Sequence, residues 1–140
     1  MNQLDQSSIS PRPTFNSIAA HAYVSDVAAA LAFYTGKLGF ALDFAYGEPP
    51  FYAQVSRDCA RIALRLVPAP VFADGVRERE QLLCASITVE SADEIEQLFL
   101  AFQASGVDFH QMLLKQPWGA RDFVISDPDS NLILFAGPAG

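Results

Sequence analysis

The chain has 140 residues, of which 51% are hydrophobic, which is enough for one domain or two small halves sharing a core and excludes a disordered or fibrous protein. Nine Lys and Arg against sixteen Asp and Glu give a net charge of −7, which disfavours nucleic acid because its phosphates are repelled by an acidic surface. Neither a membrane-spanning apolar run nor a signal peptide is apparent, so we predict a cytoplasmic protein with no membrane partner.

The first half of the chain begins with a polar leader, predicted to be flexible over residues 1–14. Alternating apolar residues then predict a strand over 18–24. A helix is predicted next, because Asp26 is a suitable N-cap and apolar residues recur at helical spacing up to Gly39. Three further strand-like runs, separated by turn-forming residues, complete this half: 40–46, 51–56 and 61–67.

The same order of elements then repeats. Apolar residues alternate with small polar ones over 83–89, which predicts a strand. A capping box at Ser91 predicts the start of a helix that ends at Gly106. Three more strand-like runs follow: 107–114, 122–126 and 132–135. The two predicted helices start 66 residues apart, at Ser25 and Ser91. We therefore predict an α+β fold of two βαβββ modules in tandem, whose eight strands form curved sheets around a cup. The predicted boundaries are a first module at 15–67, a linker at 68–81, a second module at 82–137 and a tail at 138–140.

One helix can cover only one face of the sheet in each module, and side chains alternate between the faces of a strand. The apolar residues of the first strand are expected to face the helix, which turns His21 and Tyr23 toward the cup. On the fifth strand the same alternation turns Cys84, Ser86 and Thr88 inward. These side chains are therefore candidates for the lining of the cup.

Two phrases of the sequence are distinctive: Phe33-Tyr34 followed by Leu38-Gly39-Phe40, and Asp127-Pro128-Asp129-Ser130-Asn131. Together with the tandem order they resemble the vicinal oxygen chelate superfamily, which includes glyoxalase I, extradiol dioxygenases and bleomycin-resistance proteins. The resemblance covers about residues 15–137 and implies paired βαβββ modules, commonly as a homodimer. From their residue types alone, the first segment is predicted to pack on the sheet and the second to form a turn. That family usually has Gly where Ser130 stands, so an altered turn or a positive φ at Asn131 is expected.

Enzymes of that superfamily hold a divalent metal in the cup through His, Glu or Gln on the first, fourth, fifth and eighth strands. Carried over residue by residue, those positions fall on Ala19, Arg65, Cys84 and Leu134. Ala and Leu offer no lone pair, the Arg charge repels a cation, and one thiol is a single soft ligand. We therefore predict no metal and no cofactor, and we assign no catalytic residue.

Without a metal, the cup resembles that of the bleomycin-resistance branch, which binds a compound but does not catalyse a reaction. We predict a small, anionic or aromatic ligand, because an arginine in an otherwise apolar pocket favours a carboxylate or phosphate. The predicted ligand-binding residues are His21, Tyr23, Arg65, Cys84, Ser86, Trp118 and Leu134, with Phe51 and Tyr52 as nearby aromatic side chains. Trp118 has two open roles, a lid that stacks on a planar ligand and an anchor of its loop.

Two alternatives stay open for the function. One is a metal-dependent lyase, isomerase or dioxygenase of the same superfamily with a displaced metal site. The other is a structural or regulatory subunit with a vestigial cavity. We interpret His21 as a hydrogen-bonded histidine of the pocket and not as a general base. We interpret Cys84 as a small buried hydrophobic residue and not as a reactive thiol. The charged stretch 77–80 is interpreted as solvated linker.

Overall fold

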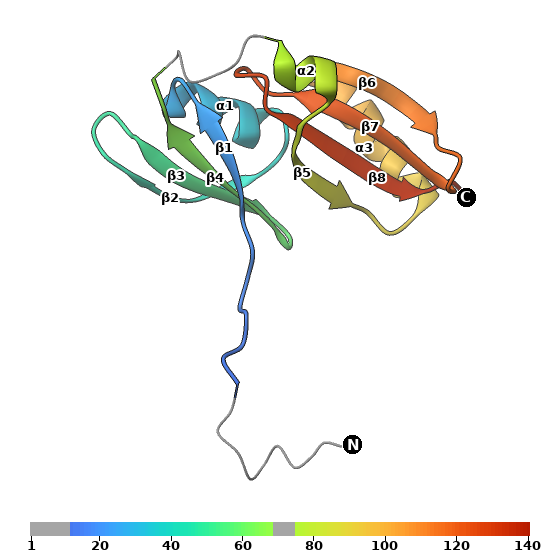
Figure 1. Cartoon of the computed structure of the whole chain (residues 1–140), viewed down its shortest axis with the longest axis horizontal. Coiled ribbons are helices and arrows are strands. Elements are labelled where there is room, and N and C mark those ends of the chain that lie inside the picture. The colour runs from blue at the N-terminus through green and yellow to red at the C-terminus, as the bar shows by residue number, and fades with distance from the viewer. Residues whose placement is uncertain (1–11, 69–74) are drawn as a thin grey trace.

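The computed structural model describes residues 12–68 and 75–140, which form a duplicated arrangement of strands and helices (Figure 1). Most of the predicted leader, residues 1–11, and part of the predicted linker lie outside the described residues. In chain order the elements are β1 (Ala20–Val24), α1 (Val27–Gly36), β2 (Ala41–Tyr46), β3 (Tyr52–Arg57), β4 (Ala60–Leu66), α2 (Val76–Glu80), β5 (Leu83–Thr88), α3 (Ala92–Ala104), β6 (Asp108–Lys115), β7 (Ala120–Ser126) and β8 (Leu132–Pro138). None of the helices within the described ranges is long and apolar enough to cross a membrane.

The eight strands form two four-stranded sheets with the same internal order, β1-β4-β3-β2 and β5-β8-β7-β6. In each sheet the first strand runs parallel to its neighbour and the other neighbours are antiparallel. The sheets lie side by side and are not closed on each other (Figure 1). The prediction of an α+β fold with tandem βαβββ modules is therefore confirmed.

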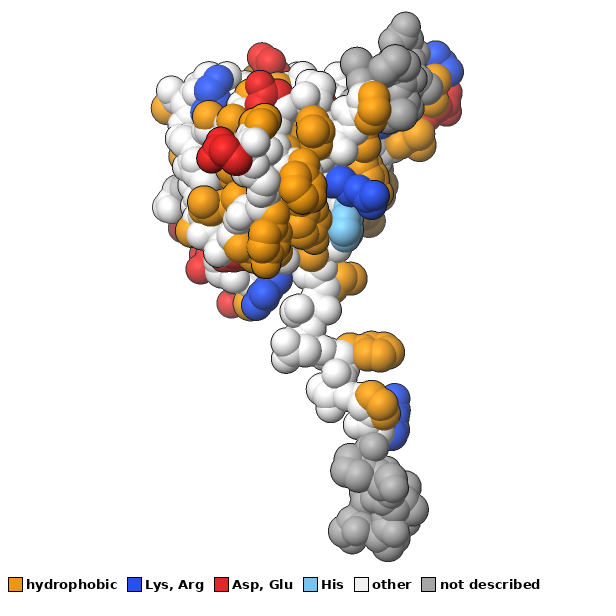
Figure 2. Space-filling view, turned by 90° about the vertical axis from the view of Figure 1, so that its left-hand side faces the viewer, with side chains coloured by type: hydrophobic (Ala, Val, Ile, Leu, Met, Phe, Trp, Pro, Cys, Tyr) orange, Lys and Arg blue, Asp and Glu red, His pale blue; other side chains and the backbone are white. Residues whose placement is uncertain are grey.

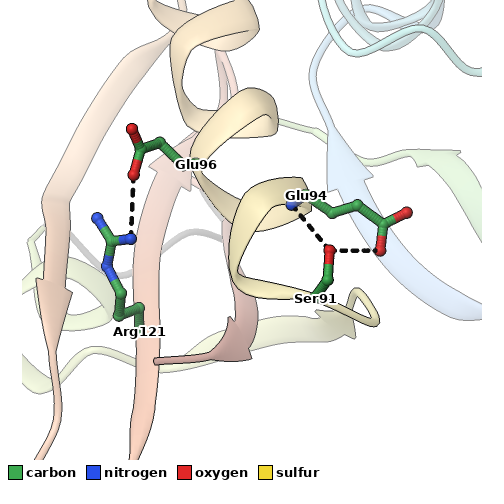
Figure 3. Close-up of polar contacts among 4 residues, drawn as sticks. All are labelled: Ser91, Glu94, Glu96 and Arg121. Atoms are coloured by element: carbon green, nitrogen blue, oxygen red, sulfur yellow. Dashed lines mark hydrogen bonds and ion pairs between the residues drawn. The ribbon is translucent and has the colours of Figure 1, made fainter. Parts of the chain in front are cut away.

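The two long helices begin where the sequence predicts. The Asp26 side chain accepts a hydrogen bond from the Ala29 N–H at 3.1 Å and caps α1. Figure 3 shows the start of α3, where Ser91 Oγ accepts a hydrogen bond from the Glu94 N–H at 3.1 Å and donates one to the Glu94 carboxylate. These side chains satisfy backbone donors that have no partner within the helix. The same figure shows an ion pair between Arg121 of β7 and Glu96 of α3, at 3.2 Å.

The core is one continuous apolar cluster that draws on both modules. In the second module Phe102 of α3 lies edge-on to Phe135 of β8 at 5.2 Å, and Phe135 stacks on Phe123 at 5.3 Å. Gly137 of β8 lies directly under α3, because a Cβ at this position would be 2.9 Å from the Cβ of Ile95. The absence of a side chain at Gly137 thus allows the helix to approach the sheet closely.

The linker differs from the prediction, since part of the charged stretch 77–80 is folded rather than solvated. It forms the short helix α2, and the guanidinium of Arg77 donates to Asn131 Oδ1 at 3.0 Å and to the Asp129 carbonyl. A charged side chain next to other charged residues gives no sign in the sequence of such a distant partner. α2 is therefore bound to the turn between β7 and β8 through Arg77.

Candidate functional site

The two distinctive sequence phrases meet where the modules join. The Tyr34 hydroxyl on α1 donates to Asp127 Oδ2, in the turn between β7 and β8, at 2.9 Å, and both groups are buried. Asp127 also accepts from the N–H groups of Asp129 and Asn131, at 2.9 and 2.8 Å. The Asn131 amide donates to Asp127 at 2.9 Å and to the Tyr23 carbonyl of β1 at 2.9 Å. These bonds form a polar joint between the first and the second module.

The electrostatics of this joint follow from its burial. Burial raises the pKa of Tyr34 well above its usual value, and the neighbouring Asp127 carboxylate adds to this shift. Burial also raises the pKa of Asp127, although its hydrogen-bond donors oppose the change. The turn itself places Ser130 at a φ of +64°, so the serine, and not Asn131, takes the left-handed conformation. Both phrases thus pack or turn as predicted, and they bind each other.

Three of the predicted site residues share the open face of the first sheet, the face away from α1. The strand register places Tyr46, Tyr52, Arg65 and Tyr23 side by side in one row across the four strands. His21 lies in the neighbouring row. Alternate residues of β1 and β3 are buried, and β4 buries the consecutive residues 62–64. The side chains of the row and of His21 are exposed or half-buried. The alternation along β1 therefore holds as predicted.

Aromatic rings that the sequence reasoning did not assign to the site dominate this face. The ring of Phe44 lies 5.5 Å from that of Tyr46 and 5.8 Å from that of Tyr52, measured between centroids. Figure 2 shows a band of hydrophobic side chains on the first module's side of the molecule, next to basic side chains and a histidine. Phe44 and Tyr46 were missed because the pairing of β2 shifts between Leu42 and Phe44, which disrupts the alternation there.

Charges are unevenly distributed on the same face. Arg61 and Arg65 of β4 are both exposed. Asp43 of β2 accepts hydrogen bonds from Gln54 at 2.9 Å and from Ser56 at 2.7 Å. These hydrogen bonds lower the pKa of Asp43, with a smaller contribution from the Arg61 charge. A negative group is thus held near the outer strand, whereas Arg65 lies among the tyrosines.

The open face of the second sheet has a different chemistry. Ser86 of β5 pairs with Leu134 of β8, and both are predicted site residues. Leu134 pairs in turn with Val124 of β7, so the three lie in one row. Asp122 of β7 is only 3% exposed and accepts from the side-chain amides of Gln111 and Gln116 at 2.7 and 2.9 Å. The sequence reasoning gave no role to this buried carboxylate, because its amide partners are brought to it by the bend between β6 and β7. The second face thus combines apolar and hydroxyl side chains with a buried carboxylate that two side-chain amides satisfy.

Cys84 and Trp118 lie apart from the other predicted residues. A register shift between Leu83 and Ala85 turns Cys84 away from the open face into the seam between the modules, where its Sγ donates to the His21 carbonyl at 3.2 Å. Burial raises the pKa of Cys84 to about 11, which fits a packed thiol. Trp118 lies in the turn between β6 and β7 beside a shallow pocket of about 280 Å³ and is 73% exposed. Its ring therefore does not anchor the loop to the sheet.

A groove of about 960 Å³ lies between the modules. It is bounded by the start of β1, the turn between β3 and β4, the free edge of β5 and one side of α3. Among the predicted site residues it includes Cys84 and Ser86, whereas His21, Tyr23 and Arg65 lie outside it. We refer to it as the seam groove.

Comparison with known proteins decides the family. The model of the Glyoxalase/Bleomycin resistance protein/Dioxygenase superfamily matches residues 14–135. The chain belongs to this superfamily. Its fold is similar to that of TioX from Micromonospora sp. ML1, with a TM-score of 0.67, 20% identity, and coverage of 89% of this chain and 99% of TioX.

Other solved structures are similar at comparable levels. A glyoxalase/bleomycin resistance protein/dioxygenase from Alicyclobacillus acidocaldarius has a TM-score of 0.71 and 19% identity, over 89% of this chain and 92% of its own. Lactoylglutathione lyase from Agrobacterium tumefaciens has a TM-score of 0.68 and 16% identity, over 90% and 96%. No curated protein matches the chain. At these identities the likeness shows the fold alone.

The superfamily's metal positions do not fit an ion in this member. Ala19 and Leu134 have no donor atom, Arg65 is an exposed cation, and Cys84 is a protonated thiol in the seam. Over residues 12–68 and 75–140, no three His, Cys, Asp or Glu side chains come together in a way that could hold a metal ion. The absence of a metal in the working protein remains a prediction from this donor set.

Proposed function

We propose that this superfamily member binds a small, anionic, aromatic molecule on the open face of its first sheet, without a metal. The observation that carries the proposal is the row of Tyr46, Tyr52, Arg65 and Tyr23 across that face. Exposed aromatic rings offer flat apolar area for stacking, and a guanidinium among them binds a carboxylate or phosphate through charge-assisted hydrogen bonds. Two exposed arginines on one face of a chain with a net charge of −7 support an anionic ligand.

A ligand on this face would be covered on one side only, whereas small-molecule sites usually bury most of the ligand. Tyr46 is 59% exposed and Tyr23 is 41% exposed in the single chain. The homodimer implied by the superfamily resemblance is therefore part of the proposal, because a second copy can supply the missing cover. A cytoplasmic location also remains part of it.

The experiment is an NMR titration of the full chain with 1-naphthoate, an aromatic carboxylate, and in parallel with the neutral 1-naphthalenemethanol. We expect the carboxylate to shift resonances of the first sheet and to bind about tenfold more tightly than the alcohol. Arg65→Gln should remove that difference. Arg79→Gln is the matched control, because Arg79 lies on α2 and pairs with Glu80, away from this face.

Four results would contradict the proposal. Equal binding of the two probes, or an unchanged preference in Arg65→Gln, would show that Arg65 does not recognise the anion. A stoichiometric divalent ion in protein purified without chelator would instead favour the alternative of a metal-dependent lyase, isomerase or dioxygenase. Failure to bind either probe, or any member of a broad metabolite set tested by thermal shift, would favour the vestigial cavity.

A further inference from the structure

Two charges of opposite sign lie on the open face of the first sheet without pairing with each other. Arg65 of β4 and Asp43 of β2 are both exposed. Over residues 12–68 and 75–140, neither side chain takes part in an ion pair. Because complementary charges determine which partner a surface accepts, this pattern favours a ligand that carries both signs.

An irregularity in β2 brings Asp43 to this face. The register of β2 against β3 shifts at this residue, which has no partner on β3. Consecutive residues of a regular strand point to opposite faces. Here Asp43 binds the side chains of Gln54 and Ser56, and the ring of the next residue, Phe44, lies 5.8 Å from that of Tyr52. Both consecutive side chains therefore lie on the open face, and a bulge that redirects a side chain in this way is common beside functional sites.

The Asp43 carboxylate is held in a fixed orientation. Gln54 donates to its Oδ2 at 2.9 Å, and Ser56 donates to its Oδ1 at 2.7 Å. These hydrogen bonds lower the pKa of Asp43, so the group is ionised at neutral pH. The Arg61 charge adds a smaller attraction without forming an ion pair. An ionised carboxylate has about four acceptor positions, so Asp43 can still accept hydrogen bonds from a ligand.

Aromatic rings occupy the surface between the two charges. The ring of Phe44 lies 5.5 Å from that of Tyr46 and 5.8 Å from that of Tyr52, and Tyr52 pairs with Arg65. Such rings stack on a planar ligand, and their faces attract an ammonium group. Two strand spacings across the sheet and roughly three residues along it place the Cα atoms of Asp43 and Arg65 about 14 Å apart. The long arginine side chain can shorten this span.

We propose that the ligand of this face is an aromatic zwitterion, whose carboxylate binds Arg65 and whose ammonium group binds Asp43. The inference rests on the proposed function, because it takes Arg65 as the anion site and adds an ammonium group to the aromatic anion. A dianion of the same size would meet the negative charge of Asp43 and is disfavoured.

The test compares three probes by NMR titration of the full chain at pH 7. They are the zwitterion 6-(aminomethyl)-2-naphthoate, the anion 2-naphthoate and the dianion 2,6-naphthalenedicarboxylate. We expect the zwitterion to bind about tenfold more tightly than 2-naphthoate, from an exposed charge pair and a cation–π contact. The dianion should bind no more tightly than 2-naphthoate. This comparison on the wild type tests the inference without any substitution.

Substitution of Asp43 then assigns the preference to a side chain. Asp43→Asn should bind the zwitterion no more tightly than 2-naphthoate, and its continued binding of 2-naphthoate shows that the variant is folded. Asp93→Asn is the matched control, because Asp93 is an exposed residue of α3 and its substitution changes the net charge equally. It should leave the preference for the zwitterion unchanged.

The binding of 2-naphthoate separates this inference from the proposed function. Suppose that 2-naphthoate binds and that Arg65→Gln weakens its binding, so that the proposed function stands. A zwitterion that binds no more tightly, a dianion that binds more tightly than the zwitterion, or a preference retained in Asp43→Asn would then overturn the role of Asp43 alone. If 2-naphthoate does not bind, or binds equally well to Arg65→Gln, both proposals are wrong.

Discussion

Replacing Tyr34 by Phe tests the joint between the modules with a minimal change of shape. The hydroxyl is one of four donors to the Asp127 carboxylate, the others being the N–H groups of Asp129 and Asn131 and the Asn131 amide. A hydrogen bond to a charged group contributes about 1.5–3 kcal/mol to stability. Since Asp127 keeps three partners, we expect Tyr34→Phe to lower the free energy of unfolding by about 2 kcal/mol.

The assay is urea unfolding at pH 7, followed by far-UV circular dichroism, with a double-mutant cycle of Tyr34→Phe and Asp127→Asn. We expect a coupling energy of about 1–2 kcal/mol between the two positions. A loss below about 0.5 kcal/mol in Tyr34→Phe, or strictly additive effects, would refute the assignment of this contact as a stabilising joint.

The pH dependence offers a second readout of the same joint. An unfolded chain ionises its tyrosines near pH 10, whereas the folded chain holds the Tyr34 proton to a higher pH because its pKa is raised. The contribution of this group to stability is therefore complete below pH 10 and decreases as the pH rises above it. Tyr34→Phe should lack this part of the alkaline decrease, and parallel alkaline profiles for both proteins would contradict the raised pKa.

Three further predictions concern single positions. Gly137→Ala should destabilise the protein by about 1–3 kcal/mol in urea unfolding, because the added methyl group collides with α3; wild-type stability would disprove this close approach. Arg77→Ala should lower the unfolding free energy by about 1–2 kcal/mol through loss of its contacts to the β7–β8 turn, and Arg79→Ala, the control on the same helix, should have little effect. With a pKa of about 11, Cys84 should be alkylated by iodoacetamide at pH 8 about a hundredfold more slowly than an ordinary thiol, as measured by mass spectrometry, and labelling as fast as at the exposed Cys59 would count against it.

The arrangement of strands and helices could be predicted because its signals are local. The alternation along β1, the cap at Asp26 and the capping box at Ser91 each lie within a few residues, and the structure confirms all three. The repetition of the same order of elements then fixed the tandem arrangement. Such signals depend on the chain next to them and not on distant partners.

The candidate site was less predictable wherever pairing becomes irregular or contacts are distant. Arg65 falls where predicted because β4 pairs regularly with both neighbours, whereas register shifts moved Cys84 off the open face and hid Phe44. Strand irregularities have no reliable local sequence signal. Arg77 and its partner Asn131 are 54 residues apart, and no periodicity in the sequence relates them.

The contact between Tyr34 and Asp127 gives a structural role to the two most distinctive motifs of this sequence. Each module contributes one side of this contact, and the four donors to the Asp127 carboxylate fix the turn and the junction of the modules. A relative that has both motifs is therefore expected to join its two modules in the same way. The presence of these motifs does not indicate whether that relative is an enzyme or only binds a ligand.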